Sequence, residues 1–173
     1  QINQKINFNN HKLKINYNNE NLLLIGSGKF KIYEDFEEIE YFFEKKNTKI
    51  NFSTKLNLKN TNFKIDNLNY KKKNDNNMLL QIEGELNDNE YLNINSLNID
   101  EGKNNIQITN LSLNNLNQIK KIDQANFDYV DNENKKNNYS IKKLSNYNYS
   151  VNGTSFNANS LISNLLERSN KEN

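Results

Sequence analysis

A glycine-rich segment, Gly26-Ser27-Gly28-Lys29, is the first part of the sequence with residue types that can bind phosphate. A phosphate loop of the form G-x-x-x-x-G-K-[ST] needs a glycine where Leu23 stands and a serine or threonine where Phe30 stands. Glycine inside a strand pattern more often marks a bulge or a break. We therefore expect a bulge or turn at this segment and no phosphate site.

Groups that act in catalysis or bind metals are scarce. The chain has no cysteine and one histidine, His11, in a polar Asn-Asn-His-Lys stretch that is typical of a solvated turn. The acidic segment YEDFEEIEYFFE has no arginine or histidine nearby in sequence, so we interpret it as a solvated face. No spacing fits a metal site. We expect a protein that is not an enzyme and binds no cofactor or metal.

The composition also argues against nucleic acid as a partner. The net charge is +2, and only one arginine is present among 23 basic residues. Lysines interleaved with Tyr and Phe are compatible with single-strand binding, but the near-neutral charge makes it a poor candidate. About a quarter of the residues are Asn, which an AT-rich genome explains better than a self-associating Asn tract does.

Alternation of apolar and polar residues dominates the chain and predicts β-strands with one apolar face. Clusters of Asn, Asp, Gly and Lys between these runs are typical of turns, so we expect an antiparallel meander. Residues 33–45 fit a helix or a strand, and we favour the strand because a turn and the strand INFS follow. The alternating pairs include Ile6 and Phe8, Leu13 and Ile15, Phe30 and Ile32, Leu56 and Leu58, Leu80 and Ile82, and Phe127 and Tyr129.

The alternation slips by one residue in three similar segments: FKIDNLNY (63–70), LNINSLNI (92–99) and IQITNLSL (106–113). If each is one strand, a β-bulge must place all four apolar side chains on one side, and the bulge bends the strand. If each is two strands joined by a two-residue turn, every strand is only about three residues long. We favour bulges and a curved sheet with a concave apolar side, with loose turns as the alternative for some segments.

The C-terminal end has a different pattern. Leu161, Ile162, Leu165 and Leu166 follow helical spacing, and we predict a helix at about 158–168 with Asn157 as its N-cap. It follows directly from a strand at 147–153; a hairpin turn at Asn152-Gly153 is the less favoured alternative. The whole chain, 1–173, is expected to be one domain, a processed protein or a section of a longer one. Its longest apolar run, LLLI, is too short to span a membrane.

Several of these segments resemble the AsmA-like family, the envelope proteins that include TamB- and YhdP-type proteins. The resemblance is carried by residues 51–86 (NFSTKLNLKN through QIEGEL), by LNINSLNI, and by the closing YSVNGTSFNANSLISNLL. In that family a Tyr-containing strand, a Gly and an Asp precede a short Leu-rich helix. Here Asn157 stands where Asp is usual, and both residues cap helices. The resemblance covers roughly residues 30–166.

The resemblance implies a long, repeating, open β-groove (β-taco-like) with an apolar concave lining. Such a groove would cross the periplasm of a Gram-negative envelope and carry phospholipid between the inner and outer membranes. Its inner-membrane anchor would lie outside this chain. The alternatives are a structural or adhesive Asn-rich β-sandwich or solenoid, and a closed lipocalin-like carrier. The residues expected to line the groove are Leu56, Leu58, Phe63, Ile65, Leu80, Ile82, Leu92, Ile94, Leu97, Ile99, Ile106, Ile108, Leu111 and Leu113.

Overall fold

The computed structural model describes residues 7–31, 35–73, 76–87, 91–114, 118–146 and 148–159. Strands make up most of these residues, as the alternation predicts. The elements are β1 (Asn7–Asn18), β2 (Asn21–Lys31), β3 (Phe36–Lys46), β4 (Lys49–Leu58), β5 (Lys64–Ile65), the 3₁₀ turn η1 (Asp66–Leu68), β6 (Tyr70–Lys71), β7 (Met78–Asn87), β8 (Tyr91–Glu101), β9 (Asn104–Leu113), β10 (Ile119–Val130), β11 (Lys136–Lys143) and β12 (Tyr149–Ser155).

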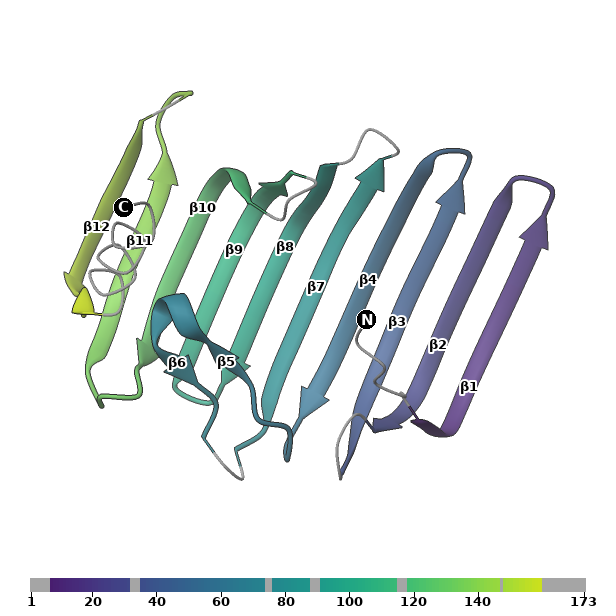
Figure 1. Ribbon diagram of the computed structural model, residues 1–173, viewed down its shortest axis with the longest axis horizontal. Coiled ribbons are helices and arrows are strands. Elements are labelled where there is room, and N and C mark those ends of the chain that lie inside the picture. The colour runs from purple at the N-terminus through teal and green to yellow at the C-terminus, as the bar shows by residue number, and fades with distance from the viewer. Residues whose placement is uncertain are drawn as a thin grey trace, which may run out of the picture.

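Ten of the strands form one antiparallel sheet in the order β1-β2-β3-β4-β7-β8-β9-β10-β11-β12 (Figure 1). Neighbouring strands in the sheet are consecutive in sequence, except that β7 lies beside β4. The predicted antiparallel meander is therefore confirmed. The sheet is not closed, because β1 and β12 form its two edges. This arrangement differs from a closed lipocalin-like barrel. Between β4 and β7 the chain leaves the sheet and forms the small hairpin of β5, η1 and β6.

The antiparallel register gathers the apolar residues on one side of the sheet, which we call the apolar face. Paired residues share a face, and Leu80 pairs with Leu56 on β4 and with Ile99 on β8. Ile99 in turn pairs with Ile106, and Ile106 with Phe127. The same rule places most of the alternating Leu, Ile and Phe residues of β1 to β10 on this face. The other side, the polar face, carries mainly Asn, Ser, Lys and Glu.

Two of the three slipped segments are bulged strands. In β8 the register with β7 shifts at Glu83 and Gly84: Leu97 pairs with Ile82, Ile94 pairs with Gly84, and Asn95 is the extra residue. On β9, Asn110 is the corresponding extra residue, because Leu111 pairs with Ile94 and Ile108 pairs with Leu97. Neighbouring strands therefore bulge at the same level, and both keep their four apolar residues on the apolar face.

The prediction of a bulged strand is wrong for the third segment, residues 63–70. It forms the β5–β6 hairpin, in which Ile65 pairs with Tyr70 across the 3₁₀ turn Asp66–Leu68. Asn69 takes the left-handed conformation with φ 49°, which Asn tolerates better than most residues. For this segment the other interpretation is correct: it is two very short strands joined by a turn.

The hairpin lies over the apolar face at one end of the strands and completes a local core. Tyr70 and Met78 are fully buried, and Ile99 and Ile106 are 1% exposed. Phe63, Ile65 and Leu68 of the hairpin pack against this core. The sheet thus has a covered end, under the hairpin, and an opposite rim formed by turns such as β1–β2 and β3–β4 (Figure 1).

Residues 36–46 form the strand β3, so the strand interpretation of this ambiguous segment is confirmed. Asn152 and Gly153 lie inside β12 and not in a hairpin turn. Asn157 accepts a hydrogen bond from the N–H of Asn159 at 3.2 Å, which is the contact expected of an N-cap. The predicted helix at 158–168 lies almost entirely outside the described residues.

The segment Gly26 to Lys29 forms no turn or bulge of its own, because it lies within β2 and pairs with β3 in unbroken register. The irregularity lies opposite it, in β1, where the register shifts between Asn9 and Lys12. The prediction that His11 is a solvated turn residue is wrong. His11 lies within β1 at this shift, and its ring stacks against Tyr41 at a centroid distance of 5.6 Å.

Candidate functional site

Twelve of the fourteen residues predicted to line a groove lie together on the apolar face. They form rows across β4, β7, β8 and β9, such as Leu80, Ile99 and Ile106, or Ile82, Leu97 and Ile108. The other two, Phe63 and Ile65, are not part of the sheet. They pack on the core from the hairpin side, so they cover the apolar face at its closed end.

The exposure of the apolar face increases away from the hairpin and towards the sheet edges. Residues next to the hairpin, such as Leu58 at 4% and Leu80 at 7%, are buried, whereas Leu86 near the opposite rim is 38% exposed. At the β1 edge, Leu13 and Ile15 are 50% and 56% exposed. Beyond the hairpin, the described residues provide no second layer over this surface.

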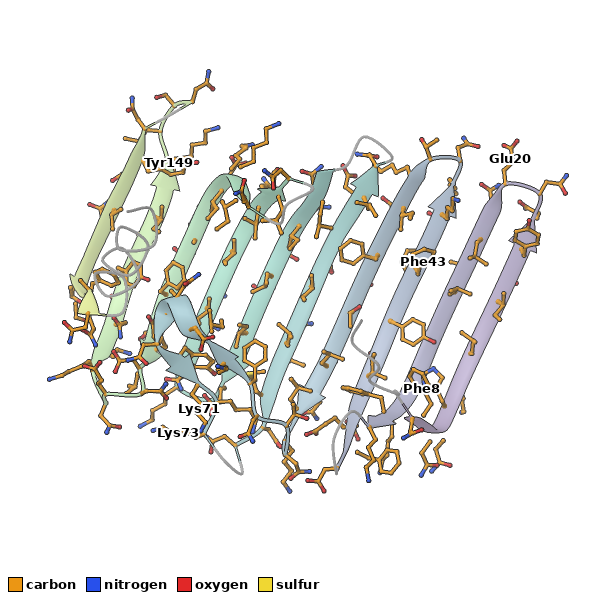
Figure 2. All side chains as sticks on the ribbon, viewed as in Figure 1. Phe8, Glu20, Phe43, Lys71, Lys73 and Tyr149 are labelled. Carbon is orange, nitrogen blue, oxygen red and sulfur yellow. The ribbon has the colours of Figure 1, made fainter. Side chains whose placement is uncertain are left out.

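The apolar face extends further towards the N-terminus than the predicted residues. Leu24 pairs with Phe43 and Phe43 pairs with Phe52, which places three large apolar side chains side by side on β2, β3 and β4. Figure 2 labels Phe43 on this part of the sheet. Alternation signals only Phe52 clearly, because Leu24 and Phe43 lie in the continuous apolar runs LLLI and YFF, and pairing with β4 decides which of their side chains lie on the apolar face.

Glu101 anchors the hairpin to the sheet from a buried position, 2% exposed. Its carboxylate accepts hydrogen bonds from the Tyr70 hydroxyl at 2.8 Å, the Lys73 N–H at 2.7 Å, Asn76 Nδ2 at 3.0 Å and Asn104 Nδ2 at 2.9 Å. Burial raises the pKa of this carboxyl, but these four hydrogen bonds outweigh burial and hold the pKa below its usual value. The charged carboxylate is therefore the form that holds the hairpin in place.

Glu37 fixes the start of the same segment. Its carboxylate accepts three backbone hydrogen bonds, from the N–H groups of Lys59 at 2.8 Å, Asn60 at 2.7 Å and Thr61 at 2.6 Å. Glu37 is 3% exposed, and three N–H donors replace the water that a carboxylate loses on burial. Part of the acidic segment thus has a structural role, whereas the sequence suggested a solvated face.

Tyr129 and the turn after β10 hold the tip of the hairpin. The Tyr129 hydroxyl donates to the Leu68 carbonyl at 2.9 Å, and the Asn132 N–H donates to the Asn69 carbonyl at 2.9 Å. Tyr70 and Tyr129 also meet edge to face with their ring centroids 5.8 Å apart. Glu37, Glu101 and Tyr129 thus hold the start, the end and the tip of the hairpin segment, and the hairpin is firmly attached over one end of the apolar face.

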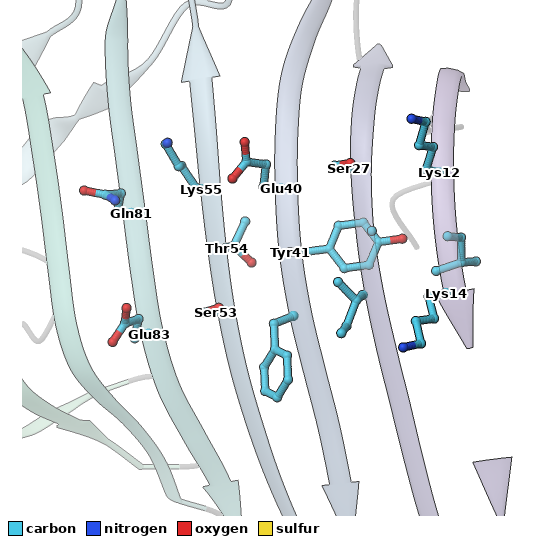
Figure 3. A pocket seen from close by; sticks show the side chains of 14 residues that line it. Lys12, Lys14, Ser27, Glu40, Tyr41, Ser53, Thr54, Lys55, Gln81 and Glu83 are labelled. Carbon is cyan, nitrogen blue, oxygen red and sulfur yellow. The ribbon is translucent and has the colours of Figure 1, made fainter. Parts of the chain in front are cut away.

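The polar face has a shallow hollow of about 700 Å³ that crosses β1, β2, β3, β4 and β7. Figure 3 shows Lys12 and Lys14 on one side of it and Gln81 and Glu83 on the other. The hollow is wide and lined by mixed charges, and its lysines and glutamates are surface residues. Within the described ranges, no group of three or more His, Asp or Glu residues is arranged to hold a metal ion.

Comparison with protein-family models, with curated proteins and with solved structures found no match to this chain. In the part of the chain that the structure describes, no helix has the length and apolar character needed to cross a membrane.

Proposed function

We propose that this chain is a section of a bridge-like lipid transport protein and binds phospholipid acyl chains on its apolar face. The observation that supports the proposal is the apolar face itself: a wide, single-layered sheet surface whose uncovered part carries Leu, Ile and Phe at half-buried positions. As the family resemblance implies, the section would work in the periplasm between the inner and outer membranes. We also propose, as part of the same function, that the sheet curves into a groove.

Hydrophobic burial is the physical basis of the proposed binding. Each buried methylene contributes about 0.8 kcal/mol, so an acyl chain with on the order of ten covered methylenes gains several kcal/mol. This interaction has no directional requirement, which suits a site without reactive or metal-binding groups. It also allows a lipid to move along the sheet, because neighbouring rows such as Leu24–Phe43–Phe52 and Ile82–Leu97–Ile108 offer similar surfaces.

The alternative, a structural or adhesive β-sandwich, needs a second large sheet to cover the first. In the described ranges, the only other sheet is the two-stranded β5–β6 hairpin, which covers one end of the apolar face. This large uncovered area favours lipid binding over a sandwich.

Mass spectrometry of the protein purified from its native envelope tests the proposal. We expect phospholipid to co-purify with the wild-type chain. Ile15→Lys and Leu86→Lys place charge on exposed positions of the apolar face and should reduce the bound lipid. Ile25→Lys is the matched control, because Ile25 is 41% exposed on the polar face. Absence of lipid from the wild type, or equal loss in the control, would contradict the proposal.

A further inference from the structure

Charged residues on the apolar face are distributed unevenly between its two ends. The carboxylates Glu37 and Glu101 lie at the covered end and are occupied by hydrogen bonds from the hairpin segment and its neighbours. At the opposite rim, Lys45 pairs with Leu22 on β2 and with Ile50 on β4, which puts it on the apolar face beside those residues. Lys45 is thus a cation at the edge of the apolar face.

Lys45 differs from the lysines next to it in its partners. Lys46 and Lys49 form ion pairs with Glu44 and Glu85 at 2.6 Å, on the polar face. Among the described residues, no carboxylate forms an ion pair with Lys45. Lys143, on β11, also lies at this rim, and it shares a hollow with the Asp123 carboxylate, which forms an ion pair with Lys121. Lys45 is therefore the rim lysine best placed to receive an external anion.

The part of β3 that precedes Lys45 provides a path for an acyl tail. Phe43, Tyr41 and Ile39 follow it on the same face of β3, and Ile39 packs against the core at the covered end. At about 3.3 Å per residue, this path from Lys45 to Ile39 is roughly 20 Å long. At its far end, Glu37 of the same strand holds the chain that leaves β4 through the N–H groups of Lys59, Asn60 and Thr61.

We propose that the apolar face binds acyl lipids in one orientation, with an anionic phosphate headgroup at Lys45 and the tail directed towards the hairpin. This inference rests on the proposed function and adds the headgroup charge and the direction of the lipid. Positive charge beside an apolar surface is complementary to an anionic amphiphile. Two lysines of the hairpin segment have partners within the protein: Lys64 pairs with Asp66 at 3.1 Å, and Lys72 donates to the carbonyls of Lys59 and Lys73.

The test compares dihexanoyl phosphatidylglycerol with dihexanoyl phosphatidylcholine, each titrated as monomers below its micellar concentration and followed by calorimetry. We expect the wild type to prefer the anionic lipid and Lys45→Gln to weaken its binding about two- to fivefold, the range for an exposed ion pair. Binding of the zwitterionic lipid should not change. Lys46→Gln, one residue away on the polar face, is the control and should change neither affinity.

Three results would overturn this orientation: equal affinity of the wild type for both lipids, an equal effect of Lys46→Gln, or loss of the anionic preference in Lys71→Gln/Lys73→Gln and not in Lys45→Gln. Figure 2 labels Lys71 and Lys73 at the rim opposite the β1–β2 turn. Failure of the proposed function gives a different result, because the wild type would then bind neither lipid.

Discussion

Leu92 and Ile99 lie on the same face of β8 although an odd number of positions separates them, because Asn95 is an extra residue between Ile94 and Ser96. In an unbroken strand they would point to opposite faces. The neighbouring bulge at Asn110 preserves the pairing of β8 with β9 through this level. The bulges thus keep the apolar face continuous, which the proposed lipid surface requires.

The bulge on β9 depends on a backbone conformation that Asn110 adopts with φ 52°. A β-branched residue is strained in this conformation, whereas glycine is not. We expect Asn110→Val to lower the free energy of unfolding by about 1–2 kcal/mol and Asn110→Gly to leave it nearly unchanged. Urea denaturation measures both. Gln107→Val, at an exposed polar-face position of the same strand, is the control. If it lowers the free energy of unfolding as much as Asn110→Val does, the φ of Asn110 is not the cause of the loss.

Gly84 allows a close approach of β7 and β8 opposite the Asn95 bulge. A Cβ at Gly84 would collide with the Asn93 carbonyl oxygen and come within 2.8 Å of the Phe52 ring. We expect Gly84→Ala to destabilise the protein by about 3 kcal/mol, because the backbone must move. Gly102→Ala should lose about 1 kcal/mol, since its Cβ would meet open space and only the φ of 64° is unfavourable. Similar denaturation midpoints for the two variants would contradict this difference.

The charge of Glu101 predicts an acid-sensitive hairpin. Its pKa is below the unfolded value in the folded protein, so its contribution is complete above the unfolded pKa of about 4.3. The contribution is lost as the pH falls through the folded pKa. We expect Glu101→Gln to destabilise the protein by about 1–3 kcal/mol at neutral pH and by less in acid. Hydrogen exchange of the Lys73 N–H should accelerate in this variant.

Glu83→Gln is the control for this pH dependence, because Glu83 is exposed on the polar face. Its stability curve should follow the wild type at every pH. If Glu101→Gln retains the full acid dependence of the wild type, Glu101 is not the group that couples hairpin stability to pH.

The sheet could be predicted from the sequence because its information is local. Alternation in segments such as Leu56–Leu58 and Leu80–Ile82 specifies strands and faces without knowledge of partners. Residues 63–70 and 92–99 have the same apolar pattern, yet one forms a hairpin and the other a bulged strand. What separates them is distant in sequence: the Tyr70 hydroxyl reaches Glu101, and Tyr129 reaches Leu68.

The same reason explains the error at His11. Its local sequence is typical of a turn, but Tyr41, thirty positions away, provides a hydroxyl at 3.0 Å from Nε2 and a stacking surface. The twelve predicted face residues were identified from alternation and, within residues 92–99 and 106–113, from the β-bulges that restore it. Phe63 and Ile65 were assigned to the wrong element because alternation identifies an apolar side and says nothing of what covers it.

Photolabelling with a diazirine-bearing phospholipid, followed by mapping of the labelled peptides, tests the central claim most directly. If the apolar face binds acyl chains, adducts will concentrate on apolar-face residues outside the hairpin, such as Leu24, Phe43 and Phe52. Adducts on Ile25 and Phe42 of the polar face, or a distribution that excess unlabelled phospholipid does not reduce, would contradict it.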